Sequence, residues 1–415
     1  MAAAPTLSIC VPSRNRQIYF QETIASLMAS LRTDVEFVFA DNSDDASIMH
    51  DFMAERMRDP RVRYLRSTGR ALPMMENWER SISAATGRYV AFIGDDDYID
   101  PDLAAFIINL EKTTKADAIA WTGPNFVWPV EGAPPRPVRV SLGTGVTRFS
   151  KASLMRKAFL WEGASHVPLS GFSIYHGALS RGLLDKIKLM GNGRFFEFPV
   201  VDYELAFKTI LLGETFIHSA RPFSILGACP LSNSVVIGSV AAERETQRVF
   251  FEEHGWNMND AEWMEGTPFR TWHGVTACIY LIQHWLSRKI GMQHHGFEEN
   301  LVRAYAANCG LYRRRTDFDQ ITAELREALA GWHDGKYLEL FTPRFYEPPA
   351  AQGPPPPAFT GLGNNSVLHF PDNIAGVRTP GELFQLFADV IVRADDIPID
   401  AKTLADRPAN ATIAA

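Results

Sequence analysis

The chain of 415 residues carries 41 basic and 48 acidic side chains, so its formal charge is −7. A net acidic chain without a basic stripe cannot neutralise a run of backbone phosphates, which excludes sequence-independent nucleic-acid binding. Charged residues make up 21% and hydrophobic residues 46% of the chain, a globular balance, and the length favours two or three domains.

The cysteines and the N-terminus indicate in which cellular compartment the protein is expected. The four cysteines lie far apart without a CxxC pair, so we expect neither a zinc site nor a disulfide framework. The N-terminal stretch lacks the positive region and apolar core of a signal peptide, and no apolar run approaches about 18 residues. We therefore expect a reduced, cytoplasmic protein, and leave open a peripheral contact with the inner face of a membrane.

The first two predicted strands end in polar turns. Residues 7–11 form an apolar run that predicts the first strand, and four residues follow it: Pro12, Ser13, Arg14 and Asn15. This turn has neither a GxGxxG nor a GK[ST] pattern, which disfavours a Rossmann dinucleotide site and a P-loop. Residues 36–40 predict a second strand that brings Asp41 to the same edge of the sheet, where its carboxylate can accept from a base or a ribose. The alternative for Asp41 is an N-cap or Asx-turn.

Helices and strands alternate through the first part of the chain. Helical spacing of apolar residues recurs around residues 24–31, 49–57, 74–85 and 103–110, and residues 61–65 predict a third strand. This alternation predicts an α/β fold with a mostly parallel, Rossmann-like sheet flanked by helices.

An acidic turn follows the next strand. Residues 89–93 are apolar without alternation, which predicts a strand buried on both faces, and Asp95, Asp96 and Asp97 follow it. Adjacent carboxylates repel one another, and Mg²⁺ or Mn²⁺ with oxygen ligands relieves that repulsion. Such a cation completes its shell with water and substrate phosphates, so we expect a diphosphate ligand. The alternative is a solvated turn that caps the helix after Pro101.

The rest of the chain predicts an irregular stretch and then helices. Residues 122–147 are rich in proline and glycine and predict an irregular excursion with an edge hairpin. Asp202 precedes an amphipathic segment at 203–212, where a plain helix cap is the alternative to a functional role. Further helices are predicted in a helical C-terminal region at 241–256, 269–289, 298–315 and 318–332. We expect boundaries at 1–235, 236–345 and 346–415, the last being a Pro-rich linker with a short helical tail.

Three segments in this order resemble the family 2 glycosyltransferases, which have the GT-A fold. They are LSICVPSRNR, FVFADNSDD and ATGRYVAFIGDDDYIDPD, and the similarity returns at Val201-Asp202-Tyr203-Glu204-Leu205. The resemblance implies that Pro12, Ser13 and Asn15 line the nucleotide base, that Arg14 stacks there, and that Asp41 binds the base or ribose. It also implies that the Asp95-Asp96-Asp97 cluster is the DXD motif, and leaves open which of the three binds the metal directly.

The same resemblance assigns the catalytic base. It implies that Asp202 takes the proton from the acceptor, with Glu204 in reserve, although Val201 replaces the acidic residue usual before the base. Arg70 is a candidate contact of the diphosphate or ribose, with a plain surface loop as the alternative. Tyr175, His176 and Arg181 are candidates for the acceptor cleft. Trp128 and Trp161 could stack on sugars or lie in the core.

By resemblance, the chain is expected to be a metal-dependent, inverting glycosyltransferase of the hexosyltransferase type. It would move a sugar from a nucleotide-diphosphate donor, UDP-sugar first, to a hydroxyl of a glycan or lipid-linked acceptor in polysaccharide or glycoconjugate synthesis. The alternatives are a sugar-phosphate nucleotidyltransferase and a non-catalytic GT-A scaffold. A role of the helical region in homodimer formation stays open.

Overall fold

The computed structural model describes residues 4–132, 135–168, 171–232, 236–255, 264–347, 359–399 and 404. Among them, the central sheet has eight strands in the order β3-β2-β1-β4-β10-β6-β11-β9. Their bounds are β1 (Leu7–Ser13), β2 (Val35–Asp41), β3 (Val62–Leu65), β4 (Tyr89–Phe92), β6 (Ala118–Trp121), β9 (Val146–Phe149), β10 (Gly177–Ser180) and β11 (Phe216–Ser219). Of these strands, β10 and β9 run against the other six. The predicted mostly parallel α/β sheet is therefore confirmed.

Two smaller sheets flank the central one. The first contains β5 (Tyr98–Ile99), β12 (Ser224–Ala228) and β7 (Asn125–Val127); the second contains β13 (Gly361–Leu362), β14 (Val367–Pro371) and β8 (Pro137–Ser141). The edge hairpin predicted within residues 122–147 is wrong. There, β9 joins the edge of the central sheet through β11, and β8 pairs with β14 from a distant part of the chain.

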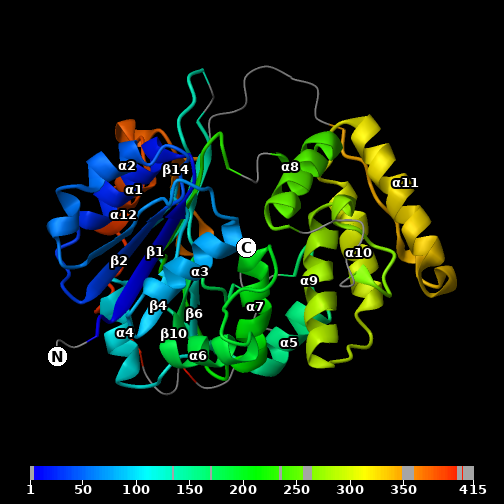
Figure 1. The fold of residues 1–415 in the computed structure, drawn as a ribbon, viewed down its shortest axis with the longest axis horizontal. Coiled ribbons are helices and arrows are strands. Elements are labelled where there is room, and N and C mark those ends of the chain that lie inside the picture. The colour runs from blue at the N-terminus through cyan, green and yellow to red at the C-terminus, as the bar shows by residue number, and fades with distance from the viewer. Residues whose placement is uncertain are drawn as a thin grey trace.

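Helices cover both faces of the central sheet (Figure 1). Their bounds are α1 (Gln17–Met28), α2 (Ser47–Met53), α3 (Met74–Ala84), α4 (Leu103–Glu111), α5 (Lys151–Phe159), α6 (Arg181–Met190), α7 (Val201–Leu212), α8 (Val240–Glu253), α9 (Val275–Ile290), α10 (Glu298–Cys309), α11 (Arg315–Gly331) and α12 (Pro380–Ala388). Short 3-10 turns add η1 (Arg56–Arg58), η4 (Thr271–His273), η5 (Trp332–Gly335), η6 (Leu338–Leu340), η7 (Asn364–Ser366) and η8 (Ile374–Gly376). No helix of the described residues is both long and apolar enough to cross a lipid bilayer.

The absence of alternation in the strands follows from burial on both faces. Along β1, Cys10 faces the core that α3, α5, α6 and α7 cover, whereas Ile9 and Val11 face the core under α1, α2, α4 and α12. All three side chains are completely buried. An apolar residue is therefore required at every position of such a strand, and not at every second one.

The predicted helical C-terminal region lies beside the sheet, in α8 to α11 (Figure 1). Its helices and the face of the sheet covered by α7 share one continuous cluster of buried apolar residues. The single helix predicted at 269–289 is interrupted. Gly274 has a φ of +90°, and a Cβ there would lie 2.5 Å from the Asn308 amide nitrogen, so the chain turns between η4 and α9. The helix predicted at 298–315 ends at Cys309, and α11 begins at Arg315.

The segment after the Pro-rich stretch returns to the sheet. Helix α12 packs against α1 and β12, and the buried Arg221 donates to the carbonyl of Val392 (2.7 Å) while pairing with Asp100 (2.7 Å). The predicted linker, 347–358, lies outside the described residues except for Glu347, and so does the tail from Asp400 on except for Leu404. The domain boundaries stay a prediction.

Parallel pairing brings the polar turns together. Ser13 at the end of β1 is in register with Asp41 at the end of β2, and β4 lies on the other side of β1. The turns after all three strands therefore open at one edge of the sheet.

Candidate functional site

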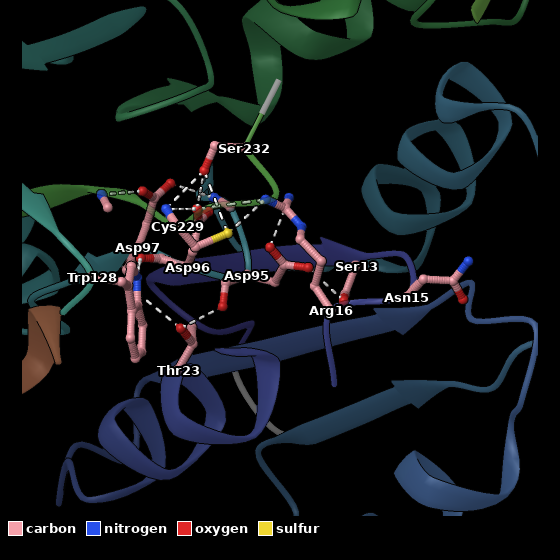
Figure 2. A network of polar contacts seen from close by, with 12 residues as sticks. Ser13, Asn15, Arg16, Thr23, Asp95, Asp96, Asp97, Trp128, Cys229 and Ser232 are labelled. Atoms are coloured by element: carbon pink, nitrogen blue, oxygen red, sulfur yellow. Dashed lines mark hydrogen bonds and ion pairs between the residues drawn. The ribbon is translucent and has the colours of Figure 1, made fainter. Parts of the chain in front are cut away.

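The acidic turn is buried at the carboxyl edge of the sheet. Asp95, Asp96 and Asp97 are 0%, 4% and 1% exposed, so the turn is not the solvated cap that was the alternative. Thr23 on α1 donates one hydroxyl to the backbone carbonyls of Asp95 (2.9 Å) and Asp97 (3.0 Å). Figure 2 shows these residues with the side chains that converge on them.

Asp95 faces the turn after β1. Ser13 Oγ donates to its Oδ2 (2.6 Å), and Arg16 Nη2 lies 2.8 Å from its Oδ1. Burial, only partly offset by the positive charge of Arg16, raises the pKa of Asp95 to about 7. Both oxygens are thus engaged by the protein.

Asp97 accepts hydrogen bonds on both carboxylate oxygens. The backbone N–H groups of Gly94 and Gly227 donate to it (2.6 Å each), as does the hydroxyl of Tyr175 (2.8 Å). His176 Nε2 lies 2.8 Å from the same oxygen as Tyr175, Oδ2. Burial alone would raise the pKa of Asp97, but the interactions with His176, Tyr175 and Gly227 outweigh it and hold that pKa below its usual value. Asp97 therefore ties three separate segments together.

Asp96 keeps one oxygen open. Its Oδ2 accepts from Ser232 Oγ (2.7 Å) and Cys229 N (3.1 Å) and lies 3.5 Å from Arg16 Nη1. Its Oδ1 accepts no hydrogen bond from a described residue. A Cβ added at Gly94 would lie 3.0 Å from this oxygen and 2.9 Å from Asp97 Oδ2, so glycine at this position lets both carboxylates lie close to the backbone.

The approach of β12 fixes the backbone of the acidic turn. A Cβ at Gly227 would lie 1.6 Å from the carbonyl oxygen of Asp96, so no other residue fits without moving the turn. The same carbonyl accepts from Trp128 Nε1 (2.9 Å). Trp128 is 7% exposed and Trp161 is completely buried, so both belong to the core and are not exposed stacking platforms.

Asp41 is buried at the end of β2. It is completely buried, and its carboxylate accepts from Ser43 N (3.0 Å) and Tyr64 Oη (3.3 Å). The first of these bonds is the Asx-turn considered as the alternative. Asn15, which has a φ of +55°, pairs with Asp44 through two hydrogen bonds (2.8 and 2.9 Å), and this pairing holds the turns after β1 and β2 together.

The two candidate arginines lie at the rim. Arg14 pairs with Glu253 at the end of α8 (2.8 Å), and His254 Nε2 accepts from Met75 N (3.3 Å). The helical region therefore borders the turn after β1. Arg70 is exposed, and its only hydrogen bond within the described chain is one that its carbonyl accepts from Thr68 (3.0 Å).

Asp202 occupies the first turn of α7 and is half-buried. Burial raises the pKa of Asp202, although a hydrogen bond from the N–H of Tyr203 (2.9 Å) opposes this. The pKa of Tyr175 is raised by burial first, then by the charge of Asp97, with smaller contributions from Asp96 and Asp202. Tyr175 therefore lies within electrostatic reach of both acidic motifs.

Two candidate positions have structural roles. Glu204, expected on a helix surface if it is not the base, is completely buried and pairs with Lys208 (2.6 Å) while accepting from the N–H groups of Glu197 and Phe198. Arg181 donates to the carbonyls of Ala85 and Gly87, before the start of β4. Its placement in an acceptor cleft was wrong, because this is the opposite end of the strand from the acidic turn.

The carboxylates of the acidic turn can be compared with the ligands that a bound Mg²⁺ or Mn²⁺ needs. Within the described ranges, no three His, Cys, Asp or Glu side chains are arranged to hold an ion together. The open Asp96 Oδ1, with Asp97 beside it, fits a Mg²⁺ or Mn²⁺ that is held by one or two carboxylates and completed by water and phosphate oxygens. It does not fit a cage of three protein ligands.

Several residues of the site were not predicted from the sequence. Arg16 contacts Asp95 and Asp96, and Gly227, Cys229 and Ser232 reach the turn from beyond β12. Arg16 could have been singled out as a cation just past the first strand tip. The residues at 227–232 could not, since only the pairing of β12 with β5 brings them near the turn.

Part of the chain is similar to a known family. Residues 8–163 match the model of the family described as glycosyl transferase family 2. The uncharacterized glycosyltransferase EpsJ of Bacillus subtilis (strain 168) is 33% identical over 98 residues, which are 23% of this chain and 27% of that protein. The chain thus spans about a quarter of the length of this curated relative. Residues 8–163 are therefore similar to glycosyl transferase family 2, and the match does not extend over the rest of the chain.

Solved structures show a more distant similarity. S. aureus TarS 1-349 in complex with UDP-GlcNAc is 15% identical, with a TM-score of 0.42, over 81% of this chain and 89% of that chain. The mannosyltransferase PcManGT of Pyrobaculum calidifontis, in complex with GDP-Man and Mn²⁺, is 15% identical, with a TM-score of 0.38, over 82% and 86%. At these scores the similarity carries no conclusion about the substrate.

Proposed function

We propose that the chain is an inverting, metal-dependent glycosyltransferase that moves a sugar from a nucleotide-diphosphate donor to an acceptor hydroxyl. UDP-sugars are the first donors to test, and a glycan or lipid-linked acceptor is part of the proposal. The observation that supports it most is Tyr175, which donates to Asp97 and lies within electrostatic reach of Asp202. The carboxylates assigned to the donor and the acid assigned to the acceptor are therefore both within electrostatic reach of one side chain.

Asp202 is assigned as the general base. Inversion needs one carboxylate that takes the hydroxyl proton as the acceptor oxygen attacks the sugar. Asp202 has a carboxylate oxygen that accepts from Tyr203 N, and its other oxygen accepts no hydrogen bond from a described residue. A pKa raised by burial makes this carboxylate a stronger base than an exposed aspartate.

The acidic turn is assigned to the diphosphate. When bound, a Mg²⁺ or Mn²⁺ ion would offset the negative charge that develops on the leaving nucleoside diphosphate. Asp96 is the residue proposed to hold it, because its Oδ1 is open. Asp95 and Asp97 orient the turn, and Arg16 adds a fixed positive charge beside it.

The turns after β1 and β2 are assigned to the nucleotide. Pro12, Ser13, Arg14 and Asn15 would border the base, and Asp41 would hold the turn from below. Arg70 would reach the diphosphate or ribose from its exposed loop. The contact of Arg14 with Glu253 makes α8 a wall of the same site.

Incubating the protein with a panel of UDP-, GDP- and dTDP-sugars and Mn²⁺, and measuring nucleoside diphosphate release, tests this proposal. We expect release from at least one donor, dependent on the metal and lowered about a hundredfold or more in Asp202→Asn. Asp185→Asn, an exposed aspartate on α6, is the matched control and is expected to match wild type. The absence of release from every donor, together with no binding of UDP, would contradict the proposal and favour a non-catalytic scaffold.

A further inference from the structure

A buried chain of polar side chains runs from Trp121 to Asp97. Trp121 Nε1 donates to Ser224 Oγ (2.7 Å), and this oxygen lies 2.8 Å from His176 Nδ1. His176 Nε2 lies 2.8 Å from Asp97 Oδ2. The four side chains are between 0% and 8% exposed, so water does not replace these contacts.

The groups at the two ends set the direction of the chain. An indole N–H can only donate, and an ionised carboxylate can only accept. Since Ser224 Oγ accepts from Trp121, its own hydrogen is available for Nδ1 of His176. Nε2 then carries the ring hydrogen and donates to Asp97. The carboxylate of Asp97, which only accepts, thus requires a ring hydrogen on Nε2 of His176.

The backbone at His176 has a conformation that most residues other than glycine avoid. Its φ is +51°, in the left-handed region, where asparagine is tolerated better than most residues. The next residue is tightly packed as well, because a Cβ at Gly177 would lie 2.2 Å from the carbonyl oxygen of Ser173. Local conformation alone would therefore favour asparagine over glutamine at position 176.

Residues 173–176 connect the two acidic motifs. Ser173 Oγ donates to the backbone carbonyl of Asp202 (3.1 Å), at the start of α7. At the other end, the N–H of His176 donates to the carbonyl of Phe92 (3.0 Å), on the strand that leads to the acidic turn. A shift of this segment would change the distance between Asp202 and the turn.

We infer that His176 is a positioning residue that keeps the proposed base in register with the donor site. It does so through its hydrogen bond to Asp97, which fixes residues 173–176 against the acidic turn. The inference rests on the proposed function for its effect on catalysis. The tautomer and the hydrogen bonds do not depend on that function.

Two substitutions separate positioning from stability. His176→Gln can place an amide N–H near the Nε2 position and keep the bond to Asp97, whereas His176→Asn is too short to reach it but suits the left-handed backbone. We expect Asn to be the more stable variant in thermal unfolding. We expect Gln to be the more active one, with kcat in Asn lowered about tenfold to a hundredfold and the KM for the donor changed less than about threefold. Ser224→Ala, which leaves the hydrogen bond between His176 and Asp97 in place, should lower kcat less than His176→Asn does.

Two results would overturn the inference. Activity that follows thermal stability, with Asn at least as active as Gln, would overturn the inference. Nitrogen-15 NMR of histidine-labelled wild type, with the signal assigned by its loss in His176→Gln, should show a hydrogen on Nε2, and a ring without a hydrogen on Nε2 would overturn the inference too. If wild type transfers no sugar, the proposed function fails, and the NMR result still decides the hydrogen-bond network.

Discussion

The guanidinium of Arg16 lies 2.8 Å from the carboxylate of Asp95, and this contact joins the turn after β1 to the acidic turn after β4. Asp95 is completely buried, while the Arg16 side chain is 23% exposed. A buried carboxylate that loses its cation must either stay charged at high cost or take up a proton.

This relationship predicts a rescue. Arg16→Met should lower the free energy of unfolding at pH 8 by about 2–3 kcal/mol, less than for a fully buried pair because Arg16 is partly exposed and Asp95 can be protonated. Asp95→Asn in the same chain should restore much of that loss, since the amide needs no counter-ion and can still accept from Ser13. Urea unfolding of the two single variants and the double variant measures the coupling. Additive losses would show that the pair contributes nothing as a pair.

Substitutions of Glu204 and of Asp202 are predicted to have different effects, although the two residues lie two positions apart. The first should lower stability, and the second should lower activity. Glu204→Ala removes one of the two carboxylates that pair with the buried Lys208 and the acceptor for two backbone N–H groups, so it should destabilise the protein by about 3 kcal/mol. Asp202→Asn should change stability by less than about 1 kcal/mol and yet remove activity. Chemical unfolding and nucleotide release on the same samples compare the two. A stable, inactive Glu204→Gln would instead favour Glu204 as the base.

Acid should weaken the helical region through His273. This side chain is 6% exposed, and burial lowers its pKa to about 4 from an ordinary value of 6.5. Because the unfolded chain binds the proton more readily, the stability from this group is present above pH 6.5 and is lost as the pH falls towards 4. The loss should reach about 3 kcal/mol. Unfolding midpoints of wild type and His273→Gln between pH 4 and 7.5 test this, and parallel curves would contradict it.

The activity should also fall as the pH is lowered, because Asp202 takes up a proton. Burial raises the pKa of its carboxyl above the ordinary 3.8, and a general base acts only when it is deprotonated. We therefore expect kcat/KM to fall as the pH drops through this raised pKa, with an acidic limb that begins above pH 4. Initial rates across pH 4 to 9, with Asp95→Asn as a control for the neighbouring raised pKa, measure it. A rate that stays flat down to pH 4 would argue against Asp202 as the base.

Local patterns predicted the frame of the fold. The apolar runs that form β1, β2 and β4 are buried on both faces. Every residue of such a run therefore indicates a buried strand. The position of β10 was not predictable in this way. It runs antiparallel between β4 and β6, and its four residues, Gly177–Ser180, carry little signal apart from the sheet that surrounds them.

The site was predictable only where one segment supplies it. The three aspartates stand next to each other, so the sequence revealed them, but their separate environments depend on residues far along the chain. Asp97 is saturated by Tyr175, His176 and Gly227, whereas Asp96 keeps an open oxygen. Tertiary pairing decides which of the three keeps a carboxylate oxygen without a hydrogen bond, and the order of residues does not contain that distinction.

The most direct test of the account is calorimetric binding of UDP with and without Mn²⁺ to wild type, Asp96→Asn and Asp185→Asn. The open Asp96 Oδ1 predicts that Mn²⁺ strengthens UDP binding by about tenfold or more in wild type and Asp185→Asn, which corresponds to at least about 1.4 kcal/mol, and that Asp96→Asn loses this gain. If UDP binds wild type equally well without Mn²⁺, or if the gain persists in Asp96→Asn, the assignment of the acidic turn to a cation and a diphosphate is contradicted.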